Sequence, residues 1–174
     1  MTGNSPDIDL SLANLWQAWF DFRHGKRSSP AVAEFEYYLE RNLFELHQAL
    51  NDRSYRHGAY QRFVVHDNKR REIAVAGVGD RIVHRLLYNY LVPLFDKTFI
   101  YDAWSCRQGK GHHAAINRAR TFMRRYRDGW YWRTDITKFF NSVNQSVMKE
   151  LLRRRVQDKD TLWLIDEVIN SYTV

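Results

Sequence analysis

The spacing of apolar residues constrains the fold of this 174-residue chain more than any other feature of its sequence. In the segments 12–20 and 32–50, apolar side chains recur every three or four residues, which is the period of an amphipathic helix. Two shorter runs, 60–65 and 71–75, have the composition of strands and flank a polar link, 66–70, so they predict a β-hairpin. The pattern therefore predicts an α+β fold.

The rest of the chain continues this mixture. Asp80 is expected to cap the next helix, and Pro93 is expected to end it. Residues 1–10 form a polar leader that we expect to be frayed. Three further helices and one buried strand are predicted: 112–126, 144–156 and 160–172 for the helices, and 130–136 for the strand.

Composition excludes several classes of protein. The single cysteine, Cys106, cannot form an internal disulfide, so a reducing cytoplasm is the expected compartment. The longest apolar run, 73–78, is far shorter than the roughly 20 residues that a membrane helix needs. The acidic start of the chain does not resemble a secretory signal. We expect a soluble, cytoplasmic protein with no membrane partner.

The charge of the chain favours a polyanionic partner. Lysine and arginine number 27 against 20 acidic residues, which suits binding to nucleic-acid phosphates but is also compatible with a solvated basic surface. The loop 107–111 precedes a helix start, where anions bind readily. The adjacent His112 and His113 point in different directions on a helix, so His113 is a better candidate for a phosphate contact than for a zinc ligand.

Two further places could carry chemistry. Asp135 lies at the end of the predicted strand, where a buried carboxylate must be paired, hydrogen-bonded or bound to a metal. The alternative is an aspartate that caps the turn by accepting a backbone hydrogen bond. Lys69 and Arg71 are two residues apart, so in a strand they would share a face and could hold a nucleotide triphosphate. The alternative for this pair is a solvated hairpin tip.

Five short motifs occur in one order along the chain: KRREI at 69–73, DRIV at 80–83, LVPLFD at 91–96, SCRQGKGHHA at 105–114 and TDITKFFNSV at 134–143. This order resembles the first half of the bacterial retroelement reverse transcriptases of the group II intron, retron and diversity-generating types. The resemblance implies a fingers subdomain of helices and a small antiparallel sheet, followed by the first part of a palm. It implies an N-terminal helical segment at 1–30, fingers at 31–127 and a partial palm at 128–174.

The resemblance also implies roles for the matching residues. Asp135 would be a catalytic aspartate that binds Mg²⁺, with the Ile136 carbonyl as a further ligand. Phe140 would exclude a ribose 2′-hydroxyl, and Lys69 and Arg71 would hold the incoming deoxynucleotide. The nucleic-acid contacts, with an RNA template and a DNA or RNA primer, would come from Arg107, Lys110, His113, Arg118 and Arg124.

One departure from the family changes the functional expectation. The second catalytic motif, Tyr-X-Asp-Asp, does not occur in this sequence. We therefore expect RNA-directed DNA polymerase chemistry only if another chain or segment supplies the rest of the palm, and no activity from this chain alone. A cut palm sheet would expose strand 130–136, so self-association is expected. The alternative function is a non-catalytic RNA-binding or assembly module.

Overall fold

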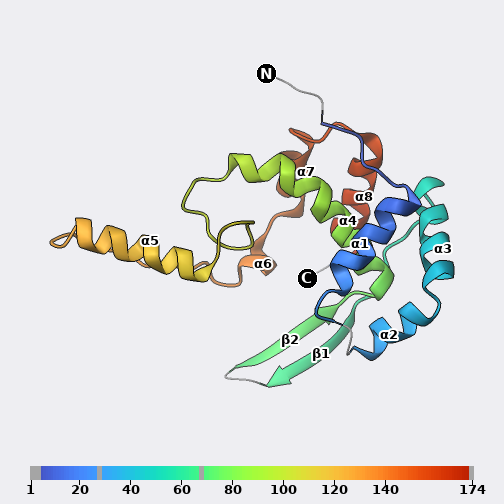
Figure 1. Ribbon diagram of the computed structural model, residues 1–174, viewed down its shortest axis with the longest axis horizontal. Coiled ribbons are helices and arrows are strands. Elements are labelled where there is room, and N and C mark those ends of the chain that lie inside the picture. The colour runs from blue at the N-terminus through green and yellow to red at the C-terminus, as the bar shows by residue number, and fades with distance from the viewer. Residues whose placement is uncertain (1–4, 27–28, 67–68, 173–174) are drawn as a thin grey trace. The chain divides into compact units, whose positions relative to one another are not determined.

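The structure is a computed structural model that describes residues 5–26, 29–66 and 69–172. Its elements are helices and one two-stranded sheet (Figure 1), which confirms the α+β class. In chain order they are α1 (Leu12–Arg23), α2 (Pro30–Tyr37), α3 (Leu39–Asn51), β1 (Gln61–His66), β2 (Arg70–Val75), α4 (Val78–Phe95), the 3₁₀ turn η1 (Asp96–Thr98), α5 (His112–Arg125), α6 (Phe139–Ser142), α7 (Gln145–Arg153) and α8 (Lys159–Asn170).

The chain forms two compact units, residues 1–91 with 144–174 and residues 92–143. The first unit holds the core: fully buried side chains of α1, α2, α3, α4 and α8 pack together, among them Leu15, Trp19, Val32, Leu43, Ile82 and Leu164. The ring of Trp19 stacks on Phe35 with centroids 5.4 Å apart. The apolar stripes predicted in the segments 12–20 and 32–50 therefore do line a core.

The β-hairpin is present with the predicted pairing. β1 and β2 are antiparallel, and the register places Phe63 opposite Ile73 and Val65 opposite Arg71. β1 is exposed along its whole length, whereas the second half of β2 is half-buried. Residues 67 and 68 of the predicted turn lie outside the described residues.

The prediction of one helix over 32–50 is wrong. The helix breaks at Tyr38, whose φ of −112° and ψ of 32° are not helical, so α2 and α3 are separate helices. The break is stabilised by the Asn42 side chain, which donates a hydrogen bond of 3.0 Å to the Phe35 carbonyl. An asparagine side chain that hydrogen-bonds to a backbone carbonyl can interrupt a helix, and the spacing of apolar residues gives no sign of such a bond.

Both predicted ends of α4 are also wrong. Asp80 is the third residue of α4 rather than its cap, and it is buried with 9% of its surface exposed. Pro93 lies inside the helix, which continues to Phe95 and then tightens into η1. Pro93 has no N–H to donate to the carbonyl four residues earlier, and the α-helix ends two residues after it.

The predicted frayed leader is ordered in the part that the structure describes. Ile8 is buried, and its backbone N–H donates to Asp158, the cap of α8, at 3.3 Å. The Tyr90 hydroxyl donates to the Pro6 carbonyl at 2.7 Å. Residues 1–4 of the leader lie outside the described residues.

The predicted buried strand 130–136 does not form. These residues have no regular secondary structure, and Trp130, Tyr131 and Trp132 are 102%, 89% and 88% exposed. A strand needs a hydrogen-bonded neighbour, and the only sheet within the described residues is that of β1 and β2.

Asn144 does cap α7 as predicted, because its side chain accepts from the Val147 N–H at 3.1 Å. Among the described residues, no helix has the length and apolar character needed to cross a bilayer.

Candidate nucleic-acid interface

The proposed magnesium ligand Asp135 is exposed in the irregular segment before α6. Its Oδ1 accepts the backbone N–H of Ile136 at 3.0 Å, which is the turn-capping contact that the sequence left as the alternative. Within the described residues, no three His, Cys, Asp or Glu side chains gather as a metal site. Phe140 in α6 is 83% exposed. Magnesium binding by Asp135 and Ile136, and sugar discrimination by Phe140, remain predictions.

The hairpin presents the two predicted triphosphate ligands to solvent. Arg71 belongs to β2, Lys69 immediately precedes this strand, and both are exposed. The neighbouring cation Arg62 of β1 lies 3.5 Å from Glu72 across the hairpin. The hairpin therefore keeps Lys69 and Arg71 accessible to an anion, and their role in nucleotide binding remains a prediction.

The loop cations Arg107 and Lys110 are engaged within their own loop. Arg107 donates through Nε to Asp96 Oδ1 at 2.6 Å and through Nη2 to Asp96 Oδ2 at 3.2 Å, and its Nη1 donates to two loop carbonyls. This bidentate pairing lowers the pKa of the Asp96 carboxyl. The ammonium of Lys110 lies 3.6 Å from the Tyr101 ring centroid and 4.2 Å from that of Trp104. These contacts give both cations a structural role in shaping the loop.

The predicted contacts on α5 divide into one paired and two exposed residues. Arg118 donates to Asp102 through Nε at 2.9 Å, and its guanidinium lies 4.4 Å from the Phe122 ring centroid. Arg124 and His113 are exposed on the same helix. Within the described residues, Arg124 forms no ion pair, so its charge is available to a phosphate.

Residues 112–133, which we call the arginine-aromatic segment, concentrate positive charge. Six arginines and one acidic residue lie in it: Arg118, Arg120, Arg124, Arg125, Arg127, Arg133 and Asp128. None of the residues of α5 is buried. Large apolar side chains of the arginine-aromatic segment are exposed as well: Met123 in α5 is 68% exposed and Tyr126, just after α5, is 59% exposed. The segment is therefore both cationic and rich in accessible aromatic surface.

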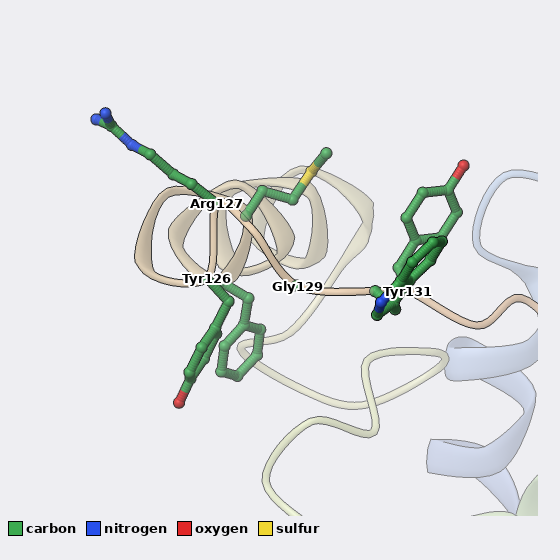
Figure 2. Close-up of a pocket in the computed structure, with 7 residues that line it drawn as sticks. Tyr126, Arg127, Gly129 and Tyr131 are labelled. Carbon is green, nitrogen blue, oxygen red and sulfur yellow. The ribbon is translucent and has the colours of Figure 1, made fainter.

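Side chains at the end of this segment border an open hollow of about 530 Å³. It is lined by Phe122, Met123, Tyr126, Arg127, Gly129, Trp130 and Tyr131. Figure 2 shows Tyr126 and Tyr131 on either side of Gly129, while the Arg127 side chain extends away from both rings. The apolar pattern predicts a buried strand here that would be exposed only if the palm sheet were cut, and it did not identify the aromatic residues as part of an RNA-binding surface. The arginines that flank them were the available signal.

A second polar cluster lies in the first unit, where the chain enters the hairpin. The Tyr55 hydroxyl donates to the buried Asp80 Oδ1 at 2.8 Å, and the Gly58 N–H donates to the same oxygen at 3.3 Å. His57 Nε2 lies 3.0 Å from His84 Nε2, and His57 Nδ1 lies 2.7 Å from the Gly58 carbonyl oxygen.

This cluster shifts two pKa values. Burial and the hydrogen bond to Asp80 raise the pKa of the Tyr55 hydroxyl, and burial and the neighbouring His57 lower the pKa of His84. The His57 ring also stacks on Tyr60, with centroids 4.9 Å apart, so the cluster supports the base of the hairpin. It was not predicted, because its members are far apart in the sequence.

Comparison with known proteins gives a distant relationship. No protein-family model matches the chain. It is 29% identical over 87 residues to nuclear intron maturase 1, mitochondrial, of Arabidopsis thaliana, and 23% identical over 108 residues to protein YkfC of Escherichia coli. The matched segments cover 50% and 60% of this chain but only 12% and 28% of those proteins. The similarity to an intron maturase supports an origin related to the group II intron reverse transcriptases.

Proposed function

We propose that this chain binds RNA through the arginine-aromatic segment, as part of a protein related to group II intron reverse transcriptases. The observation that carries the proposal is the joint exposure of arginines and aromatic rings in residues 112–133. Neutralising phosphates with cations releases condensed counterions, which is the main source of affinity for nucleic acid. The maturase similarity favours RNA over other polyanions.

Arg120 and Arg124 are the cations best placed for this role. They lie four residues apart on α5, so their side chains are neighbours on one helix face. Both are exposed, and within the described part of the chain neither forms an ion pair. By contrast, Arg107 and Arg118 are held by Asp96 and Asp102, so we expect them to contribute less to phosphate binding.

RNA binding is tested with the double variant Arg120→Gln/Arg124→Gln and a fluorescently labelled single-stranded RNA. The affinity should fall, and the slope of log affinity against log salt between about 50 and 200 mM should decrease by roughly 0.7 for each phosphate that the variant no longer neutralises. The matched control is Arg41→Gln/Arg154→Gln, which also removes two exposed arginines; these pair with Glu45 at 3.7 Å and with Glu150 at 2.7 Å. Equal affinities for the double variant and the control would contradict the proposal.

RNA-directed DNA synthesis is the second candidate function. It rests on the maturase similarity and on Asp135, whose exposed carboxylate is accessible to Mg²⁺. Two-metal nucleotidyl transfer needs further carboxylates, which another chain or segment would supply, while Lys69, Arg71 and Phe140 would hold the deoxynucleotide.

Primer extension on an RNA template discriminates the two candidates. The chain alone should give no product, and Asp135→Asn should leave the RNA affinity unchanged if the chain is a binding module. Synthesis by this chain alone that is abolished in Asp135→Asn would overturn the assignment of the missing carboxylates. A loss of RNA affinity in Asp135→Asn would instead place the carboxylate within the RNA-binding site.

A further inference from the structure

We infer that Tyr126, Trp130 and Tyr131 form a stacking site for the unpaired bases of single-stranded RNA. The inference rests on the proposed RNA binding and deepens it, because it names a base-contacting site beside the phosphate-contacting arginines. Trp130 and Tyr131 belong to the segment 130–136, for which the sequence predicts self-association, and no sequence motif assigns either of them a contact with RNA.

The exposure of these side chains is the first observation. Trp130 is 102% exposed and Tyr131 is 89% exposed, whereas Trp19 in the core of the first unit is completely buried. Single exposed apolar residues are ordinary, but several large aromatic rings together on a surface mark a binding site. Rings that are free on their faces can stack on nucleobases, and such stacking tolerates any base because every base has a π-face.

A hydrogen-bonded backbone turn separates Tyr126 from Trp130 and Tyr131. The Gly129 N–H donates to the Tyr126 carbonyl at 3.1 Å, and the Tyr126 N–H donates to the Phe122 carbonyl at 2.9 Å at the end of α5. A Cβ on residue 129 would approach the Tyr126 carbonyl oxygen to 3.2 Å, so glycine suits this position. Tyr126 and Tyr131 thereby lie on either side of the turn (Figure 2). The hollow of about 530 Å³ beside them is open to solvent, because the rings that line it are largely exposed.

The charge around the hollow selects an anionic ligand. Arg127 belongs to its lining, although its guanidinium points away from the Tyr126 and Tyr131 rings (Figure 2). Arg124 and Arg125 lie in the last turn of α5, and Asp128 is the one acidic residue of the segment 112–133. Aromatic platforms beside cationic grooves are the usual means of binding single strands. Duplex RNA keeps its bases stacked inside the helix, so it cannot use such a platform. The combination of charge and exposed rings therefore fits unpaired RNA better than a protein surface or a duplex.

The test compares an oligouridine with an abasic ribose-phosphate strand of the same length and charge. Wild-type protein should bind the oligouridine at least about fivefold more tightly, and its tryptophan fluorescence should be quenched on binding. The variant Trp130→Leu/Tyr131→Leu keeps only Tyr126 of the three rings, so it should lose most of the preference for oligouridine, with the affinity for the abasic strand and the salt slope unchanged. The control Tyr37→Leu, at an α2 tyrosine that is 79% exposed, should behave as wild type.

The outcomes separate this inference from the proposed function. Equal binding of both strands by wild type would overturn the stacking site and leave phosphate binding intact. Binding of neither strand would overturn the proposed function and the inference with it. If the double variant kept the preference for oligouridine but no longer showed concentration-dependent self-association in sedimentation, the aromatic rings would be a protein interface, and the inference would be wrong.

Discussion

The hydroxyl of Tyr55 should stabilise the first unit through its hydrogen bond to Asp80, and Tyr55→Phe isolates that hydrogen bond. The variant keeps the ring, which is 6% exposed, so no cavity forms, and it removes only the donor 2.8 Å from Asp80 Oδ1. Hydrogen bonds to charged groups contribute about 1.5–3 kcal/mol. Because the Gly58 N–H still donates to the same oxygen at 3.3 Å, we expect a loss near the lower end, about 1.5–2 kcal/mol in the free energy of unfolding.

Urea unfolding followed by far-UV circular dichroism measures this loss. Tyr37→Phe is the matched control, because this tyrosine is 79% exposed and its change should stay within about 0.5 kcal/mol. Burial raises the pKa of the Tyr55 hydroxyl, which therefore keeps its proton, so the difference should be the same at about pH 7 and pH 9. A variant as stable as the control would show that Asp80 is satisfied without Tyr55, and the reasoning would fail.

Three other side chains should give measurable effects when they are changed. The lowered pKa of His84 means that the unfolded chain takes up its proton first, so stability should fall as the pH drops below about 6.5, and chemical denaturation of His84→Gln should show a weaker fall. Arg107→Gln should increase proteolytic cleavage of the loop 96–111 while leaving the urea midpoint of the first unit unchanged, because its partners all lie in that loop. Asn42→Ala should lower the unfolding free energy by about 0.5–1.5 kcal/mol in urea titrations, since it removes the bond to the Phe35 carbonyl across the α2–α3 break.

The secondary structure that depends on local spacing was predictable from the sequence. The strands of the hairpin, the cap of α7 by Asn144 and the helices from Leu12 and His112 follow from periodicity and capping residues. The break at Tyr38 and the burial of Asp80 were not predictable in the same way. Each depends on a side-chain hydrogen bond that apolar spacing does not reveal, from the nearby Asn42 in one case and from the distant Tyr55 hydroxyl in the other.

The candidate site was predictable as a basic region but not in its geometry. The sequence identified Arg107 and Lys110 as nucleic-acid ligands, although both are engaged within their loop by Asp96 and by the rings of Tyr101 and Trp104. The sequence does not show which acid or aromatic ring will hold a given cation. Asp128 lies four residues after Arg124, yet Arg124 is exposed and forms no ion pair among the described residues.

The two candidate functions require different conformations of the segment 130–136. A polymerase palm requires these residues as a strand with a hydrogen-bonded neighbour, and pairing would cover aromatic surface that is now exposed. Base stacking requires the same surface to stay open. Asp135 is affected as well, because its Oδ1 now accepts the Ile136 N–H and a metal ion would compete for that oxygen. RNA stacking on Trp130 and assembly of a catalytic site around Asp135 should therefore be mutually exclusive states of one segment.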